Sequence, residues 1–325
     1  MEKRKGLSIM NNMLFLSKVG KKYIEEIQSI APNFNVISKD DVEDISKYIE
    51  DVEVMVCFDG DAKKELIDDA KNLKWIHLLS AGADAMPFDI LKQRNIILTN
   101  SKGVHKYQIS EQVLGYMLLF ERGLNYFIRK QINREWDKSV RVSELYGKTV
   151  CILGVGSIGE EIARIAREFG MKTVGVRKSG KSSPFIDEMY TDENMIYAVS
   201  NADYVICALP LTDDTYHLLD AEFFKSMKSD SVFINIGRGS VVDEVSLIDA
   251  LRQKNIRGAA LDVFGNEPLS KDSPLWDMEN VVITPHTAGI SPRYMERAVQ
   301  ILKHNLKAYM GDGDYINVID LKKQY

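Results

Sequence analysis

Three polar side chains that could handle a small carboxylate and a proton follow separate apolar runs of the 325-residue chain. Arg238 follows SVFINIG, Glu267 follows AALDVFGN, and His286 follows VVITP. Arginine binds a carboxylate through two parallel hydrogen bonds, and histidine is suited to proton transfer near neutral pH. A nearby glutamate would favour the imidazolium and orient the ring. Each residue alone could be a surface residue, but together they predict acid–base chemistry on a small carboxylate.

A parallel α/β fold would bring these residues to one place. Short apolar runs alternate with helix-like stretches along the chain, which is typical of a parallel sheet covered by helices. Ligands bind at the carboxyl ends of the strands in such sheets, and Arg238, Asp262 and His286 each come just after an expected strand. The other histidines lack this setting and are interpreted as packing or surface residues: His77, His105, His217 and His304.

The expected elements form two doubly wound domains. The first has strands at 13–17, 54–58, 75–79 and 96–99, with helices near 21–30, 42–50 and 62–71. The second has six strands, at 149–153, 173–176, 204–208, 231–236, 258–261 and 281–284. The residues before the first strand are interpreted as a tail.

A last helix is expected to return the chain to the first domain. Ser291 would be its N-cap and Pro292 its first residue, and it would end near Met310. Residues 105–290 would then form a dinucleotide-binding domain inserted into a discontinuous substrate-binding domain, made of residues 1–104 and 291–325. A cleft between the two domains would hold the site.

The stretch TVCILGVGSIGEEIARIAREFG contains a glycine-rich turn between an expected strand and an expected helix. Gly154, Gly156 and Gly159 match G-x-G-x-x-G, a weak signal alone that this context strengthens. They would permit the tight turn, the approach of a pyrophosphate and the packing of helix on strand, respectively. Free N–H groups at the helix start, around Ser157 and Ile158, would bind the phosphate. The helix carries an apolar stripe, formed by Ile158, Ile162, Ile165 and Phe169. A purely structural strand–turn–helix is the alternative.

The stretch GVRKSG stands where dinucleotide-binding folds often have an acid that holds a ribose hydroxyl. An acid there would repel a 2′-phosphate. Arg177, with Lys178 and Ser179, would instead offer donors to that phosphate, and the guanidinium plane could stack on adenine. We therefore predict NADP(H) as the preferred cofactor, with NAD(H) as the alternative. The alternative interpretation is that this segment is a solvated basic loop that binds no ligand.

The composition excludes some partners. The chain has 42 basic and 47 acidic residues, a formal charge of −5, which argues against nucleic acid but allows a local phosphate site. Cys57, Cys151 and Cys207 each lie in an apolar run without a CxxC pair. They are expected to be buried in strands rather than to bind metal or form disulfides, which favours the reducing cytoplasm. The first apolar stretch is too short and broken for a signal peptide or a membrane span.

A helix expected at 109–124 is apolar on most of its faces. Its apolar residues are Val113, Leu114, Met117, Leu118, Leu119 and Phe120. A helix that is apolar all round is buried. The pattern leaves open whether the core, another domain or another subunit covers it.

Together these stretches resemble the D-isomer-specific 2-hydroxyacid dehydrogenase family. The resemblance rests on GKTVCILGVGSIG, ALPLTDDTYHLLD, NIGRGSVVDEVSLIDAL, AALDVFGNEPL and TPHTAG, and on the earlier HLLSAGADAM and TNSKGVHKYQISEQVLGYMLLFERG. The motifs follow the family's order and cover nearly the whole chain beyond its first residues. The resemblance implies a flavodoxin-like substrate domain, a Rossmann nucleotide-binding domain, and a homodimer formed through the helix at 109–124.

The resemblance also implies residue roles. His286 would protonate the substrate carbonyl oxygen during reduction, Glu267 would orient the histidine, and Arg238 would hold the carboxylate and carbonyl, with hydride coming from the nicotinamide. Backbone N–H groups around Ala81 and Gly82 would receive the carboxylate. Asp262 would bind the nicotinamide carboxamide, and further cofactor contacts would come from Leu209, Pro210, Thr215, Ile236 and Gly237.

Three features depart from the family pattern, and one of them is Arg177 in place of the usual acid. Gln112 stands where many members have histidine, which we expect to affect packing more than chemistry. The chain stops at Tyr325, without the regulatory domain of many phosphoglycerate dehydrogenases, which argues against a role in serine biosynthesis.

The function expected from the sequence is the NADPH-dependent reduction of a small 2-oxoacid of the glyoxylate or hydroxypyruvate type. One alternative is an NAD-dependent D-2-hydroxyacid or phosphoglycerate dehydrogenase. Another is a dinucleotide-sensing, corepressor-like protein, because such relatives can keep all three site residues. A methyl-donor-binding protein is disfavoured because it would leave those residues without a role.

Overall fold

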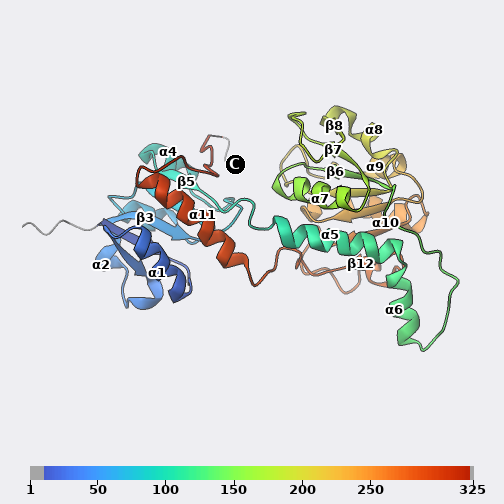
Figure 1. Cartoon of the computed structure of the whole chain (residues 1–325), viewed down its shortest axis with the longest axis horizontal. Coiled ribbons are helices and arrows are strands. Elements are labelled where there is room, and N and C mark those ends of the chain that lie inside the picture. Colours follow the sequence, from blue (N-terminus) through green and yellow to red (C-terminus); the bar gives the residue numbers. More distant parts are fainter. Residues whose placement is uncertain (1–10, 323–325) are drawn as a thin grey trace, which may run out of the picture. The chain divides into compact units, whose positions relative to one another are not determined.

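The computed structural model describes residues 11–322, so the residues interpreted as a tail lie largely outside the described part. The chain divides into two compact units, which are described separately. The two units are named for their places in the sequence. The outer unit contains the chain up to Val104 and from Ser291 onward, and the central unit is His105–Ile290. In Figure 1 the outer unit therefore combines blue and red segments, and the central unit runs from green to orange.

The outer unit is built on a five-stranded parallel sheet with the order β2–β1–β3–β4–β5. This is the flavodoxin-like strand order. The strands are β1 (Asn11–Phe15), β2 (Phe34–Ser38), β3 (Val52–Cys57), β4 (Trp75–Leu78) and β5 (Ile97–Thr99). The helices are α1 (Lys21–Ile30), α2 (Ser46–Ile49), α3 (Lys64–Asp69), α4 (Phe88–Arg94) and α11 (Tyr294–Tyr309), with a short 3₁₀ turn, η1 (Lys39–Asp41).

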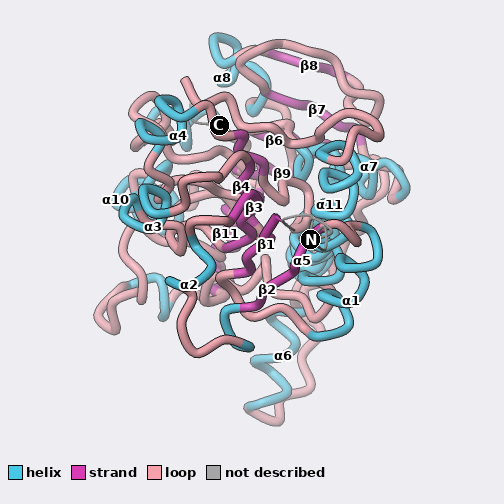
Figure 2. Tube along the Cα trace, turned by 90° about the vertical axis from the view of Figure 1, so that its left-hand side faces the viewer, coloured by secondary structure: helices cyan, strands magenta, loops and turns pink. Residues whose placement is uncertain are grey.

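Helices cover both faces of this sheet. Helices α1 and α11 lie on one side of the strands and α3 and α4 on the other (Figure 2). Strands β3 and β4 are buried along their whole length, as expected for central parallel strands. Strand β2 was not expected from the sequence, because this edge strand is only partly buried and lacks a continuous apolar run.

The last helix begins later than expected. It starts at Tyr294 with Arg293 as its N-cap residue. The hydroxyl of Ser291 accepts the N–H of Arg293 over 3.2 Å in a turn before the helix. The expected cap at Ser291 and helical start at Pro292 are therefore wrong, because the side chain closes a local turn instead.

The central unit is built on a seven-stranded parallel sheet with the order β12–β11–β10–β9–β6–β7–β8. Counted from β6, this is the Rossmann order extended by one strand. The strands are β6 (Thr149–Leu153), β7 (Lys172–Val176), β8 (Glu188–Tyr190), β9 (Tyr204–Cys207), β10 (Val232–Asn235), β11 (Gly258–Leu261) and β12 (Val281–Ile283). The helices are α5 (Lys106–Glu121), α6 (Leu124–Ile132), α7 (Ser157–Glu168), α8 (Met195–Val199), α9 (Ala221–Ser226) and α10 (Glu244–Arg252). Short 3₁₀ turns occur at η2 (Asp192–Asn194), η3 (Gly239–Val241) and η4 (Pro274–Asp277).

The six strands expected in this part are present, with small changes at their ends. The strand that was missed, β8, is a three-residue edge strand whose residues are only half-buried. The three cysteines are buried in β3, β6 and β9, which confirms the prediction. Burial raises the pKa of the Cys151 and Cys207 thiols to about 12. Within residues 11–322, none of the helices is both long and apolar enough to span a membrane.

Two helices of the central unit pack differently from their sequence patterns. Helix α5 buries Val113, Tyr116, Met117 and Phe120 in the core of its own unit, and Leu114, Leu118 and Leu119 are only partly buried. Helix α7 contacts α5, and its buried residues Ile162, Ala163 and Ala166 belong to the same core cluster as the buried residues of α5. Of its expected stripe only Ile162 is fully buried, whereas Ile158 and Ile165 are partly buried. Phe169 is exposed and follows the last residue of the helix.

Candidate active site

The three residues predicted to form a site lie at one edge of the central sheet. Arg238 follows β10, Glu267 lies in the loop after β11, and His286 follows β12. These three strands are adjacent and parallel. Their carboxyl ends therefore present the three loops along the same edge, where open α/β sheets bind ligands.

His286 and Glu267 are in direct contact. The imidazole Nδ1 lies 2.7 Å from Oε2 of Glu267. The other carboxylate oxygen, Oε1, accepts the backbone N–H of Phe264 over 3.0 Å. The two side chains are 52% and 36% exposed, so the pair can be reached by a ligand. Because Nδ1 faces the carboxylate, Nε2 is the ring nitrogen that can serve a reacting group.

The pKa of Glu267 is lowered from its ordinary value. Burial alone favours the protonated carboxyl, but the hydrogen bonds from His286 and Phe264 and the charges of His286 and Arg238 outweigh it. The carboxylate of Glu267 therefore stays charged even at pH values somewhat below the ordinary pKa of a glutamate, and it is protonated only at a still lower pH.

The backbone of His286 adopts a left-handed conformation, with a φ angle of 53°. Such a conformation costs on the order of 1 kcal/mol for a residue other than glycine. Its N–H group donates to the carbonyl oxygens of Asp262 over 2.8 Å and Thr284 over 3.0 Å. The Asp262 carboxylate also accepts the N–H groups of Thr287 over 2.9 Å and Ala288 over 3.0 Å. These bonds hold the histidine in its unusual conformation.

Arg238 is positioned by a residue that the sequence interpretation missed. Asn235 is 1% exposed, accepts the N–H of Gly237 over 3.1 Å and donates to the carbonyl of Arg238 over 3.3 Å. The exposed guanidinium is close enough for its charge to act on Glu267 and on His105, whose pKa is lowered mainly by burial. The only sequence signal was one asparagine at the end of an apolar strand.

The glycine-rich turn has a distinct geometry at each glycine. Gly154 has a φ angle of 97°, and a Cβ atom there would lie 2.8 Å from the carbonyl oxygen of Ala208. A Cβ atom at Gly159 would lie 2.4 Å from the carbonyl oxygen of Gly154. Gly156 has nothing within 4 Å of such an atom. The first and last glycines are needed by the fold, and the open space at Gly156 fits a dinucleotide pyrophosphate at the start of α7.

This contrast predicts two different outcomes for glycine-to-alanine substitutions. We expect Gly159→Ala to destabilise the fold by about 2 kcal/mol or more, because the methyl group would collide with backbone. We expect Gly156→Ala to keep its stability and to weaken NADPH binding, because its methyl group would fill the open space. Denaturant unfolding and NADPH titration measure the two effects. An equal loss of stability in both variants would contradict the role of Gly156.

Arg177 folds back onto the glycine-rich turn. Its Nε donates to the carbonyl of Val155 over 2.7 Å, and its Nη2 donates to the same oxygen. Nη2 also lies 3.4 Å from the carboxylate of Glu160 in the first turn of α7. Lys178 pairs with Asp214 over 3.1 Å, and the hydroxyl of Ser179 accepts the N–H of Lys181 over 3.4 Å. Both cations predicted to meet a 2′-phosphate therefore have an acidic neighbour.

The remaining predicted cofactor residues of the central unit lie around the same strand ends. Ser157 and Ile158 are the first residues of α7, and Ile236 is buried at the end of β10. A Cβ atom at Gly237 would lie 2.6 Å from the carbonyl oxygen of Leu209, so the loops after β9 and β10 pack closely. The hydroxyl of Thr215 donates to the carbonyl of Pro210 over 2.7 Å and thereby closes the 210–215 turn.

Ala81 and Gly82 belong to the outer unit, in the loop after β4. The carbonyl of Ala81 accepts a hydrogen bond from Asn100 over 2.6 Å. The carbonyl of Gly82 accepts one from the hydroxyl of Ser80 over 2.9 Å. Side chains thus hold the two peptide groups that flank Gly82.

Comparison with known proteins gives the family of the chain. Residues 114–288 match the family model described as D-isomer specific 2-hydroxyacid dehydrogenase, NAD binding domain. Glyoxylate/hydroxypyruvate reductase B of Shigella dysenteriae is 35% identical over 227 residues, which cover 68% of this chain and 70% of that protein. D-3-phosphoglycerate dehydrogenase of Methanocaldococcus jannaschii is 30% identical over 288 residues, which cover 86% of this chain but only 54% of that longer protein.

A solved structure covers nearly the whole chain. It is a D-isomer specific 2-hydroxyacid dehydrogenase from Xanthobacter autotrophicus in complex with NADPH and MES, with a TM-score of 0.80 and 27% identity. The alignment covers 97% of this chain and 100% of that one. The chain therefore belongs to the D-isomer-specific 2-hydroxyacid dehydrogenase family of NAD(P)-dependent oxidoreductases.

Proposed function

We propose that the protein reduces a small 2-oxoacid, of the glyoxylate or hydroxypyruvate type, to the 2-hydroxy acid with NADPH. The observation that carries this proposal is the 2.7 Å contact between His286 and Glu267 at the carboxyl edge of the central sheet. Arg238 follows the neighbouring strand β10, and its charge acts on Glu267. A proton donor and an anion-binding cation are the groups that reduction of a 2-oxoacid carbonyl requires.

Each residue has one role in this proposal. His286 donates a proton from Nε2 to the carbonyl oxygen, and Glu267 holds the ring through Nδ1. Arg238 binds the substrate carboxylate and stabilises the charge that develops on the carbonyl oxygen. Ala81 and Gly82 of the outer unit remain proposed substrate-binding residues, through their backbone N–H groups. The bound nicotinamide supplies the hydride.

Asp262 keeps its proposed role toward the nicotinamide carboxamide. The structure adds a second task, because both of its carboxylate oxygens accept hydrogen bonds from the loop that carries His286. With a side chain that is 2% exposed, Asp262 supports the histidine directly from the end of β11.

The preference for NADPH is supported by the end of β7. Arg177 occupies the position where an acid would hold the ribose hydroxyl and repel a 2′-phosphate. Its guanidinium already lies against Val155 of the glycine-rich turn. The relative from Xanthobacter autotrophicus was solved with NADPH, which also favours this cofactor.

A matrix of small 2-oxoacids against NADPH and NADH tests the proposal. We expect turnover of glyoxylate or hydroxypyruvate, with a higher kcat/KM for NADPH. Exclusive use of NAD(H), or oxidation of 3-phosphoglycerate alone, would reject this proposal in favour of an NAD-dependent dehydrogenase. Tight cofactor binding without turnover of any 2-oxoacid would instead favour a dinucleotide sensor.

We also propose a cytoplasmic homodimer. Helix α6 and the segment after it expose several large apolar side chains: Leu124 (45%), Ile128 (53%), Ile132 (74%) and Trp136 (92%). Such exposure is typical of a surface covered by a partner. The three unpaired, buried cysteines are consistent with a reducing compartment. Sedimentation of the protein and of Trp136→Glu would detect the dimer and its loss.

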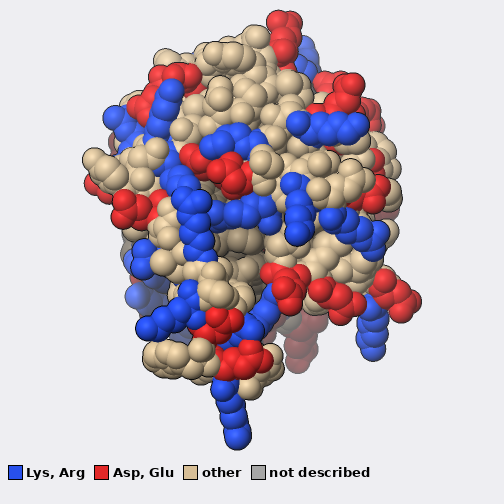
Figure 3. Space-filling view, turned by 90° about the vertical axis from the view of Figure 1, so that its right-hand side faces the viewer, with Lys and Arg blue, Asp and Glu red and all other residues tan. Residues whose placement is uncertain are grey.

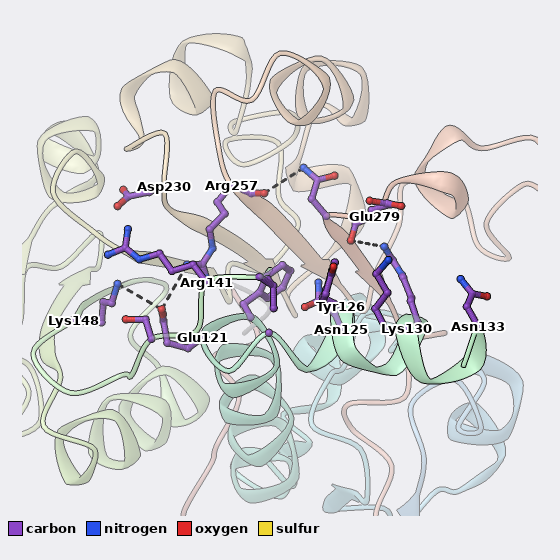
Figure 4. A pocket seen from close by; sticks show the side chains of 16 residues that line it. Glu121, Asn125, Tyr126, Lys130, Asn133, Arg141, Lys148, Asp230, Arg257 and Glu279 are labelled. Carbon is purple, nitrogen blue, oxygen red and sulfur yellow. Dashed lines mark hydrogen bonds and ion pairs between the residues drawn. The ribbon is translucent and has the colours of Figure 1, made fainter. Parts of the chain in front are cut away.

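A pocket of about 580 Å³ adjoins this exposed surface. Its lining includes Lys148, Arg257 and Glu279, which precede the strands β6, β11 and β12, so it lies at the sheet edge opposite His286. Figure 4 shows Lys148 and Arg257 directed toward the buried Glu121, each 3.6 Å from its Oε1. Lysine and arginine side chains also gather around a hollow on the face seen in Figure 3. We assign this region to the proposed subunit contact rather than to the substrate.

The contact between His286 and Glu267 predicts a change in pH dependence. We expect the wild-type kcat for reduction to fall on the acid side only below the ordinary pKa of a glutamate, because the pKa of Glu267 is lowered and its carboxylate, which holds the ring, is protonated late. Glu267→Gln has no carboxylate to protonate there, so we expect a lower kcat without this acid limb. Profiles of kcat from the acid to the neutral range compare the two proteins. Superimposable profiles would contradict the role of the Glu267 carboxylate.

A further inference from the structure

A chain of hydrogen bonds connects helix α5 with the loop that carries His286. Nε2 of Gln112 donates to the hydroxyl of Tyr116 over 2.9 Å. The Tyr116 hydroxyl lies 2.5 Å from Oγ1 of Thr284, and Thr284 donates in turn to Oδ1 of Asp262. Tyr116 and Thr284 are 168 positions apart in the sequence. The chain ends on the carboxylate that organises the histidine loop.

The direction of the donors in this chain is determined by its ends. The amide nitrogen of Gln112 can only donate, and an ionised carboxylate at Asp262 can only accept. Thr284 has one hydroxyl hydrogen, which points to Asp262, so the hydrogen between Tyr116 and Thr284 must come from Tyr116. All donors therefore point toward Asp262, an arrangement in which neighbouring hydrogen bonds strengthen one another.

Water cannot easily replace the partners in this row of hydrogen bonds, because the groups are buried. Tyr116 is 3% exposed and Asp262 is 2% exposed. Burial is the main cause that raises the pKa of Tyr116, so its hydroxyl keeps the hydrogen that it donates. A buried hydrogen-bonding group that loses its partner costs more than the net value of the bond.

The far end of the chain determines the conformation of His286. The carboxylate of Asp262 accepts hydrogen bonds from the hydroxyl of Thr284 and from the backbone N–H groups of Thr287 and Ala288. Its backbone carbonyl accepts the N–H of His286. These bonds surround a residue with a left-handed φ angle of 53°. A shift of Thr284 or Asp262 would therefore be felt at the imidazole and at its contact with Glu267.

We propose that Tyr116 is a positioning residue for the reaction, which acts through Thr284 and Asp262 to keep His286 aligned with Glu267. Gln112 is the first donor of the same chain, although the sequence suggested a packing role for it. The inference rests on the proposed function, because His286 is the proton donor there. It assigns to α5 a direct connection with the proton-donating loop.

Tyr116→Phe tests this role. We expect kcat for 2-oxoacid reduction to fall about tenfold, the effect of one lost hydrogen bond, while the Kd for NADPH stays unchanged. The alkaline limit of the kcat profile should also move to lower pH, because the imidazole is held less well against Glu267. Thr284→Val should reproduce both effects, and Thr284→Ser, which keeps the hydroxyl, should restore most of the rate.

Tyr204→Phe is the matched control. Tyr204 is 1% exposed, and its hydroxyl also bonds to α5, through the carbonyl of Met117 over 3.2 Å and the carboxylate of Glu121 over 2.5 Å. It has no bond to Thr284 or Asp262 among those of the described residues. We expect it to lower stability without moving the pH profile. Equal profiles for Tyr116→Phe and wild type, or equal shifts for Tyr116→Phe and Tyr204→Phe, would overturn the proposal.

A readout that does not need turnover separates this inference from the proposed function. The imidazole of His286 can be followed by NMR titration of the NADPH complex, with His286→Asn to assign its signal. We expect a lower titration midpoint in Tyr116→Phe and in Thr284→Val. A wild type without turnover would reject the proposed function alone, whereas an unchanged midpoint in both variants would reject the positioning role. Thr284→Val also provides the answer if Tyr116→Phe does not fold.

Discussion

Replacing His286 by alanine is expected to lower kcat for 2-oxoacid reduction by about 10²- to 10⁴-fold, the usual contribution of acid–base catalysis by a positioned side chain. The imidazole is the proton donor of the proposed reaction, and its Nδ1 is held 2.7 Å from Glu267. Removing it leaves Glu267 without its main partner and leaves the carbonyl oxygen to be protonated by water.

The same substitution should leave the cofactor site intact. The Kd for NADPH should stay within about twofold of the wild-type value, because the glycine-rich turn lies after β6 and His286 follows β12. Steady-state kinetics and fluorescence titration with NADPH measure the two quantities. His304→Gln is the matched control, because His304 lies in α11 and bonds to the carbonyl of Asp314. A kcat that survives His286→Ala would exclude the assigned mechanism.

Replacing Arg177 by aspartate is expected to lower the ratio of kcat/KM with NADPH to kcat/KM with NADH by about 100-fold or more. In the proposed complex with NADPH, the variant would lose charge-assisted hydrogen bonds to the 2′-phosphate and would place a negative charge beside it. It also gains an acceptor for the ribose hydroxyl of NADH. Both changes act in the same direction, so the ratio is a sharper measure than either rate alone.

The acidic neighbour of Arg177 provides a second variant with the opposite sign. Glu160 lies 3.4 Å from the guanidinium and would share it with a phosphate. We expect Glu160→Gln to raise the NADPH to NADH ratio several-fold, since a like charge near the phosphate is removed. Lys225→Asp makes the same charge change as Arg177→Asp at an exposed position of α9 and should leave the ratio unchanged. A wild-type preference for NADH would reject the proposal for NADPH.

The sequence by itself determined the elements that depend on local patterns. Strands β6 and β11 have the expected bounds, because buried parallel strands are continuous apolar runs between turns. Gly154 and Gly159 were recognised because a tight turn and a close helix need residues without side chains. Arg238 and His286 were found because each is a polar residue that directly follows such a run.

The tertiary structure decided what depends on residues far apart in the chain. Asn235, Tyr116 and Thr284 carry no local signal of their partners, and the hydroxyls of Tyr116 and Thr284 meet across 168 positions. Arg177 was predicted from its position, but only the fold shows that it lies on Val155 and beside Glu160. Ser291 matched a cap pattern and closed a turn instead. Local sequence determines which segments form strands and turns, whereas the partners of a buried hydroxyl or a charge depend on which segments pack together.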